Sequence, residues 1–362
     1  MSNSRPSPAN SSLRSADVIV IGDGVIGLAC ALAIARAGGT CRILGRAIGG
    51  AASAASGGLL APSIGRADPS FRAFMRASRD RYPAWVHWLA ERTGIDIPLS
   101  RAGIIELGND AVDNTATNAE LLDSAALAAL EPSIGWTGAA RLHHEDGYVD
   151  NVRLLAALRE AARCEWSIDV VDGRLAAIQP GIDDCSVRTE DGRSQFAKKV
   201  IVAAGAWSAL IVGAPRPIPV EPVRGQMVLI EGCPLSHAVS SPDAYLVPRG
   251  GSTLVGSTLE RVGFDHSTTP PAIERLRIAA GQVVPKLANA PTADSWGGLR
   301  PMTPDGLPII GHDPDLSSVI YACGHGKNGI LLAPITGEVV AALAAGTPSP
   351  HDISEFAVER FD

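Results

Sequence analysis

The sequence predicts an α/β protein in which a discontinuous Rossmann-type domain carries an inserted α+β domain built on an antiparallel sheet. Three observations lead to this fold class. A glycine-rich turn interrupts the first apolar run, "VIVIGDGVIGLA" (18–29). Two later buried runs, "VIVAAG" (200–205) and "VIYACG" (319–324), also end in glycine. Between them, from Pro217 to about Thr258, β-branched residues alternate and are broken by Pro and Gly, which is typical of antiparallel strands.

Composition narrows the class of protein. The chain has 362 residues, a formal net charge of −7 and 46% hydrophobic residues, which suits two domains with buried cores. Mild acidity without a basic tract argues against nucleic acid as a partner. Six cysteines without a C-x-x-C pair favour a reducing, cytoplasmic location with no disulfides and no metal site. No apolar stretch has the length of a membrane span, and residues 1–16, rich in Ser, Pro and Asn, are expected to be a disordered lead-in.

Residues 17–44 are predicted to form the opening βαβ unit. A strand at 18–21 leads into an Ala-rich helix at 25–37, and a second strand follows at 42–44. The turn before the helix is Gly22-x-Gly24-x-x-Gly27, whose glycines allow a pyrophosphate to approach the helix N-terminus. Asp23 lies inside this turn and would repel a pyrophosphate unless its carboxylate points away.

The acid that usually binds a ribose is missing from this unit. Such a fold places Asp or Glu at the end of its second strand, about twenty residues after the glycine-rich turn. Here the strand ends in Leu44-Gly45-Arg46. Taken alone, Gly45 and Arg46 suggest a 2′-phosphate and hence NADP. In the context of the whole chain three outcomes stay open: another group holds the ribose, Arg46 contacts the adenosine half, or the cofactor binds more weakly.

Capping residues predict the helices that follow. The small-residue stretch "GGAASAASGGLLAP" (49–62) fits where the chain passes very close to a flat or bulky group. Asp68-Pro69 is expected to begin a helix, Asp150 to cap one that runs to about Arg163, and Pro334 to open the last one. The first of these helices has a basic face, which we expect to be solvated, with a subunit interface as the alternative. That face consists of Arg72, Arg76 and Arg79.

Two stretches in the last third carry chemistry. "WGGLRPMTPDGLPIIG" (296–311) surrounds Arg300 with glycines and apolar residues. A buried guanidinium needs a partner, so Arg300 either belongs to a structural ion pair or clamps a substrate carboxylate. "GHGKNGILLAP" (324–334) is a glycine turn whose amides suit partial negative charge, such as that of a reduced flavin. In this turn we expect His325 to be structural, whereas Lys327 either reaches the site or stays in solvent.

Together and in this order, these stretches resemble the glycine/D-amino-acid oxidase family of FAD flavoproteins, and among them most of all the glycine oxidases of thiamine-thiazole synthesis. The resemblance covers 17–361 and includes "AAGAWS" (203–208) and "AYLVPR" (244–249). It implies non-covalent FAD, O2 as co-substrate and a homo-oligomer, a tetramer or dimer. It also implies an FAD-binding domain made of 17–90, 142–215 and 296–362, and a substrate domain made of 91–141 and 216–295.

The reaction implied by the resemblance is oxidation of glycine or another small amino acid to the imine, which water converts to a glyoxylate-type keto acid and ammonia while O2 becomes H2O2. The alternatives are a sarcosine or D-amino-acid oxidase, or a dehydrogenase that passes electrons to a carrier. Carried over at matching positions, Arg300 and the Tyr245 hydroxyl bind the substrate carboxylate, with Lys327 as a third catalytic candidate. Leu259 and Leu60 are implied to line the pocket. No side-chain base is required.

The resemblance also implies a set of cofactor contacts in the glycine-rich turn, the small-residue stretch and the last glycine turn. At Gly326 and Lys327 this chain departs from the bulky residue and the arginine usual in the family. With Leu259 in place of a methionine, these departures shift the expectation toward sarcosine or other small secondary amines. The implied FAD contacts are Gly22, Gly24, Val25, Ile26, Gly27, Arg46, Ser53, Ala54, Gly58, Leu59, Val171, Ala204, Gly205, Trp207, Gly326, Lys327, Asn328, Gly329 and Ile330.

Overall fold

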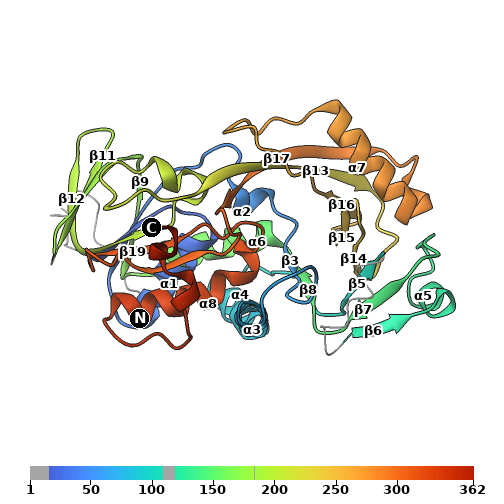
Figure 1. The fold of residues 1–362 in the computed structure, drawn as a ribbon, viewed down its shortest axis with the longest axis horizontal. Helices are drawn as coiled ribbons and strands as arrows, with labels where there is room; N and C mark the ends of the chain where they lie inside the picture. Colours follow the sequence, from blue (N-terminus) through green and yellow to red (C-terminus); the bar gives the residue numbers. More distant parts are fainter. Residues whose placement is uncertain (1–15, 109–118, 183) are drawn as a thin grey trace.

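The computed structural model describes residues 16–108, 119–182 and 184–362. The expected disordered lead-in therefore lies outside the described residues, apart from Ala16, which begins the first strand. Two large β-sheets form the two ends of an elongated molecule, and helices gather beneath the first sheet (Figure 1). The predicted α/β class with an added antiparallel sheet is confirmed.

The first sheet has a parallel centre, as expected of a Rossmann-type unit. Its strands follow the order β10-β11-β12-β1-β2-β9, with β19 beside β12 and β18 beside β19. The parallel strands are β1 (Ala16–Ile21), β2 (Cys41–Gly45), β9 (Ile168–Asp172), β12 (Ser194–Val202) and β19 (Val319–Cys323). The antiparallel additions are β10 (Leu175–Pro180), β11 (Cys185–Thr189) and β18 (Ile309–His312).

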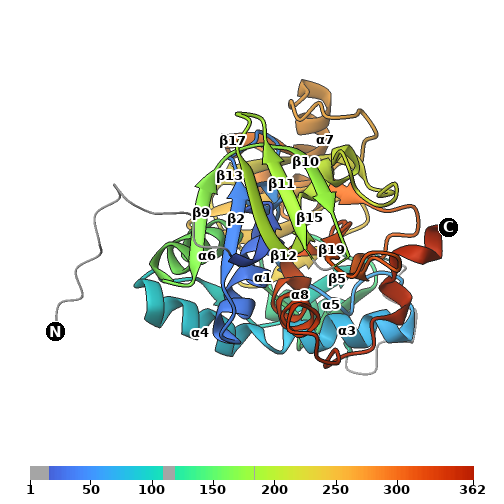
Figure 2. The ribbon, with the colours of Figure 1, turned by 90° about the vertical axis from the view of Figure 1, so that its left-hand side faces the viewer.

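Helices cover one face of this sheet (Figure 2). Both helices begin where predicted: Asp68 stands at the N-cap of α3 without a side-chain capping bond, whereas the Asp150 side chain accepts from the amides of Val152 and Arg153. The long helices of this layer are α1 (Val25–Arg36), α3 (Pro69–Arg79), α4 (Tyr82–Thr93), α6 (Asn151–Cys164) and α8 (Gly329–Ala344). Shorter elements are α2 (Ala52–Ala55), η2 (Gly205–Leu210), η4 (Ser354–Phe356) and η5 (Val358–Phe361).

The prediction that the last helix opens at Pro334 is wrong. Helix α8 begins at Gly329 and contains Pro334 in its interior. A proline has no N–H to donate to the carbonyl four residues earlier, here that of Ile330. The Tyr82 hydroxyl donates to this carbonyl instead, and the Ser78 hydroxyl donates to the next one, that of Leu331, at 2.6 Å. Side chains from α3 and α4 thus supply the hydrogen bonding that lets a buried helix pass through a proline.

The second sheet is antiparallel except where β14 pairs with β5, and its order is β17-β13-β16-β15-β14-β5-β7-β6. Helix α7 (Pro270–Val283) packs against it, and α5 (Ser124–Leu130) and η3 (Pro285–Leu287) lie at its edges. Its strands are β5 (Ile104–Leu107), β6 (Ala119–Leu122), β7 (Ala140–His143), β13 (Glu221–Glu231), β14 (Ala238–Ser240), β15 (Tyr245–Arg249), β16 (Ser252–Gly256) and β17 (Thr292–Met302). A small third sheet joins β3 (Leu59–Leu60), β8 (Gly147–Val149) and β4 (Leu99–Ser100).

The long ribbon formed by β13 and β17 connects the two ends of the molecule (Figure 1). It belongs to the second sheet but runs back toward the first, where Arg300 lies opposite Val223. Residues 296–302 and 142–143 therefore pair within the second sheet, although the sequence assigned both segments to the cofactor domain. Because one ribbon spans both units, its residues can contact a cofactor and a substrate at their junction.

The expectation of a solvated basic face on α3 is also wrong. The Arg79 side chain is only 3% exposed and forms ion pairs with Asp146, Glu145 and Asp80. Arg72 donates to the carbonyls of Pro62 and Gly65 at 2.9 and 3.0 Å. Both arginines therefore attach α3 to neighbouring segments. The periodicity of these arginines resembled that of a surface helix because the acids that bury Arg79, Glu145 and Asp146, lie more than sixty residues away in sequence.

Candidate functional site

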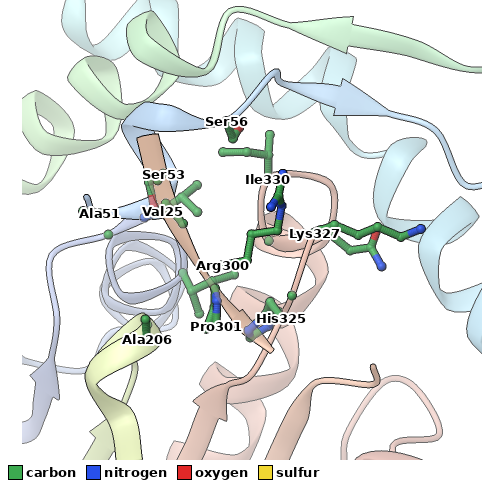
Figure 3. Close-up of a pocket in the computed structure, with 18 of the residues that line it drawn as sticks. Val25, Ala51, Ser53, Ser56, Ala206, Arg300, Pro301, His325, Lys327 and Ile330 are labelled. Carbon is green, nitrogen blue, oxygen red and sulfur yellow. Dashed lines mark hydrogen bonds between the residues drawn. The ribbon is translucent and has the colours of Figure 1, made fainter. Parts of the chain in front are cut away.

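A cavity of about 1580 Å³ runs from the glycine-rich turn after β1 to the β13–β17 ribbon. Segments from both ends of the molecule line it, among them 22–26, 51–59, 203–207 and 322–331. Figure 3 shows the Arg300 side chain among the lining residues, with Val25 and Ser53 on one side and Ile330 on the other. Three of the stretches that the sequence singled out thus meet around one space.

The glycine-rich turn is closely packed against β12. A Cβ atom on Gly22, whose φ is +115°, would lie 2.3 Å from the Ala203 carbonyl oxygen, and one on Gly27 would lie 2.0 Å from that of Gly22. The turn therefore requires glycine at both positions. The amide of Val25 at the start of α1 donates to the Ser53 hydroxyl at 3.0 Å. This bond fixes the small-residue stretch against the helix N-terminus, where backbone amides favour negative charge.

Two side chains that sequence reasoning missed hold the small-residue stretch in place. The Asn151 amide donates to the carbonyls of Ser53 and Ala54 at 2.9 and 3.1 Å. Arg249 donates to the Gly57 carbonyl and to the Asn151 side-chain oxygen, and also pairs with Asp150 at 3.5 Å. Arg249 lies within the quoted "AYLVPR", but its partners lie about a hundred residues away, so no local pattern indicated this function.

Arg300 is a half-buried cation whose hydrogen-bond partners here are neutral. Its guanidinium donates to the Ser257 hydroxyl at 2.5 Å and to the Thr258 carbonyl at 3.1 Å. Within the described ranges it forms no ion pair, so the structural ion pair considered from the sequence is absent there. Burial lowers the pKa of Arg300, yet a guanidinium stays charged near neutral pH. Burial of such a charge is energetically unfavourable unless an anion pairs with it.

Tyr245 lies beside Arg300 at the same end of the cavity. Its hydroxyl donates to the Met227 sulfur at 3.2 Å, and a Cβ atom on Gly57 would come within 3.0 Å of the hydroxyl oxygen. Burial raises the pKa of Tyr245, and the positive charge of Arg300 opposes that rise. The phenol therefore stays protonated near neutral pH and is available as a hydrogen-bond donor. A guanidinium and a phenol side by side form a suitable site for a small carboxylate.

The turn before α8 contributes backbone rather than charge. Two of its amides are already engaged, since Gly326 donates to the Pro301 carbonyl and Asn328 to that of His325, both at 2.9 Å. Gly329 and Ile330 stand in the first turn of α8, where amides have no acceptor within the helix. His325 is buried, pairs with the Thr336 hydroxyl at 3.1 Å, and has its pKa lowered to about 3 by burial. It is neutral and structural, as expected.

Lys327 belongs to the same turn but points away from Arg300 (Figure 3). The residue is exposed, and its Nζ would lie 3.9 Å from a Cβ atom on Gly65. The side chain thus extends toward the loop before α3, on the side of the turn opposite to the proposed carboxylate site.

The other expected residues divide between the cavity and its surroundings. Leu259 lines the cavity and is 67% exposed, which places it at the mouth. Leu60 is 1% exposed within the core beneath the first sheet and does not line the cavity, whereas its neighbour Leu59 does. Near the adenosine end the lining passes through Gly173 and Arg174 rather than Val171. The remaining implied cofactor contacts all line the cavity, apart from Gly27, which packs beneath the turn.

The cavity fits a long dinucleotide. Its glycine-rich end accepts a pyrophosphate at the α1 N-terminus, and the small side chains at 51–55 leave room along its length. Its far end offers amides of the α8 turn and the carboxylate site at Arg300. The fold and this cavity are those of an enzyme that depends on a dinucleotide cofactor.

Comparisons with known proteins give the family. A model of the FAD dependent oxidoreductase family matches residues 17–343, and the chain belongs to that family. It therefore uses FAD, as the resemblance implied. Glycine oxidase of Pseudomonas aeruginosa is 34% identical, with the match covering 92% of this chain and 97% of that protein. The crystal structure of glycine oxidase from Geobacillus kaustophilus is 30% identical and superposes with a TM-score of 0.89 over 95% of this chain and 98% of that one.

Several relatives are about twice as long as this chain. The bifunctional protein ThiO/ThiG of Synechocystis sp. is 34% identical over 95% of this chain. The match covers 54% of that protein, so the chain spans about half the length of this relative. Within the described part of the chain, no helix is long and apolar enough to cross a membrane.

Proposed function

We propose that this protein oxidises glycine, or another small amino acid with a free carboxylate, to the imine. The observation that carries the proposal is Arg300, whose half-buried guanidinium has only neutral partners in the described residues and lies with Tyr245 at one end of the cofactor cavity. The similarity of this chain, over nearly its full length, to proteins named glycine oxidase supports the same substrate class.

In this reaction Arg300 and the Tyr245 hydroxyl bind the two carboxylate oxygens and so direct the amine-bearing carbon into the cavity. The C–H and N–H bonds of the substrate are exchanged for a C=N bond, and water later converts the imine to glyoxylate and ammonia. Bound FAD supplies the two-electron acceptor and passes the electrons to O2, which becomes H2O2. The protein's part is orientation of the substrate in a site shielded from water.

We further propose that the reaction serves thiazole formation for thiamine in the cytoplasm and that the protein is a homo-oligomer, a dimer or tetramer. Similarity to the ThiO part of bifunctional ThiO/ThiG proteins supports the pathway. Sarcosine is the second substrate to test. The lysine that would favour a sarcosine-type site, Lys327, is directed away from Arg300, so the geometry gives that alternative no added support.

The test is a substrate panel with two measurements. The purified yellow protein is mixed anaerobically with glycine, sarcosine, D-alanine or D-proline. The loss of the flavin absorption band at about 450 nm is then followed. Peroxide is then measured in air. Fast bleaching and peroxide with glycine support the proposal. Bleaching without peroxide indicates a dehydrogenase, and a flavoprotein that none of the four amines bleaches contradicts the proposed substrate class.

A further inference from the structure

The Asp23 side chain occupies the place of the acid that is missing from the end of β2. A Cβ atom on Gly45 would lie 2.4 Å from the Asp23 Cβ, 2.7 Å from its Cγ and 2.9 Å from its Oδ1. The carboxylate of Asp23 therefore stands where an Asp or Glu side chain at position 45 would begin. Both residues line the cavity at its glycine-rich end. An acidic group is thus present at this point, although it comes from the turn after β1.

The surroundings of Asp23 hold its carboxylate away from the α1 N-terminus. Its Oδ2 accepts from Arg159 Nη2 on α6 at 3.2 Å, and within the described residues Oδ1 has no donor at hydrogen-bond distance. The side chain is 27% exposed, so Oδ1 remains accessible from the cavity. Arg159 also offsets a charge that would otherwise repel a nearby pyrophosphate.

Arg46, the other candidate at this point, is engaged elsewhere. Its Nε lies 3.5 Å from Asp172 Oδ1 at the end of β9, and both side chains are more than half exposed. Arg46 borders the cavity, but its partner Asp172 is not part of the cavity lining.

We propose that Asp23 is the carboxylate that binds the adenosine ribose of FAD in this chain, with Arg159 as its positioning residue. In the usual arrangement the acid is at the end of the second strand and the turn position is small. Here the two positions are exchanged, with the acid in the turn and glycine at the strand end. The exchange works because the two Cα positions face the same volume, which has room for one side chain only.

The proposal rests on the family's use of FAD and not on the identity of the amine substrate, so its test measures cofactor affinity alone. The full chain, freed of FAD, is titrated with FAD and with an FAD analogue whose adenosine ribose lacks the 2′-hydroxyl, and flavin fluorescence gives each Kd. The wild type should bind FAD about tenfold more tightly than the analogue, the effect of one charge-assisted hydrogen bond. Asp23→Asn should lose most of this preference by weakening FAD and not the analogue.

Asp172→Asn is the matched control, because it removes a neighbouring acid that is outside the cavity, and it should keep the full preference. If Asp23 only repels the pyrophosphate, Asp23→Asn should have the opposite effect. Removing the charge would then make FAD and its analogue bind more tightly, and by the same factor. Equal or tighter binding of FAD by Asp23→Asn, with the preference retained, overturns the proposal.

An exchange of the two residues gives an independent test. Gly45→Glu alone should weaken FAD binding, because its Cβ atom collides with Asp23. Since the closest atom is the Asp23 Cβ, only glycine at position 23 removes the collision. The double variant Asp23→Gly/Gly45→Glu should therefore bind FAD more tightly than either single variant and regain the preference for the 2′-hydroxyl. A double variant that binds no better than the singles contradicts the exchange.

Discussion

Replacing Arg300 by methionine tests the carboxylate site most directly. Methionine keeps much of the apolar stem and removes the guanidinium, which donates to Ser257 and Thr258 in the absence of substrate. If Arg300 forms two charge-assisted hydrogen bonds to the substrate carboxylate, their loss costs about 3–5 kcal/mol. That corresponds to a fall in kcat/KM for glycine of roughly 10²- to 10⁴-fold. FAD should stay bound, because the guanidinium is not at the pyrophosphate or adenosine end of the cavity.

The same substitution should leave the fold as stable as before. Arg300→Met loses two hydrogen bonds to neutral groups, worth about 1 kcal/mol each, but it also removes a buried charge that has no counter-ion in the described residues. The two effects oppose each other, so the Tm of the holoenzyme in excess FAD should change by no more than about 2 °C. An unchanged Tm together with a large loss of kcat/KM would show that Arg300 serves substrate binding and not the stability of the fold.

Arg224→Met is the matched control. Arg224 lies on the partner strand of the same ribbon and is more deeply buried than Arg300, but it pairs with Glu260 at 2.8 Å and Asp265 at 2.6 Å. Removing it leaves a half-buried acid unpaired, which should cost about 2–3 kcal/mol after allowance for the exposure of both acids. The Tm should fall by several degrees. If instead Arg300→Met lowers the Tm as much as Arg224→Met and leaves the KM for glycine unchanged, Arg300 is structural and the proposed site is wrong.

Three further changes probe the remaining parts of the site. Tyr245→Phe should raise the KM for glycine about tenfold with little change in kcat, since one hydrogen bond to a carboxylate is lost; an unchanged KM would remove the phenol from the site. Lys327→Ala should change kcat/KM less than twofold because Nζ points away from Arg300, and a loss above tenfold would show that it turns inward. For His325, whose pKa is about 3 when folded, the unfolded chain binds the extra proton, so stability is lost as the pH falls below about 6.5. When the pH falls from 7 to 5, the free energy of unfolding measured in urea should decrease by about 2 kcal/mol more for the wild type than for His325→Gln. Equal decreases would show that His325 is protonated in the folded state.

Local patterns predicted the parts of the fold in which neighbouring residues decide the outcome. The turn at Gly22 and the helix starts at Asp68 and Asp150 depend on a few adjacent residues, and the structure has all three, although only Asp150 caps its helix through its side chain. The opening of α8 was missed because the hydrogen bonding that permits Pro334 in a helix comes from Ser78 and Tyr82, about 250 residues earlier. Propensity describes proline in isolation and contains no information about such donors.

Side-chain direction was predicted less well, for the same physical reason. Leu60 and Leu59 form a two-residue strand, and its pairing with β8 decides which of them faces the cavity. A shift of one residue exchanges the faces, and the sequence does not specify that register. The helix pattern predicted an exposed Arg79, but an ion pair with Asp146 buries it. The direction of the Asp23 side chain is determined by Arg159 on α6. Each of these outcomes depends on a contact between residues distant in sequence.

The large side chains of the site are positioned by the absence of side chains around them. A Cβ atom on Gly225 would lie 2.2 and 2.3 Å from the two terminal nitrogens of Arg300, and one on Gly57 would lie 2.6 Å from the Tyr245 ring. Any larger residue at either position would have to displace the group proposed to bind the carboxylate. A stretch of small residues is therefore structurally informative, because it indicates where the backbone leaves space for a guanidinium, a phenol or a cofactor. This explains why the glycine- and alanine-rich stretches identified the family.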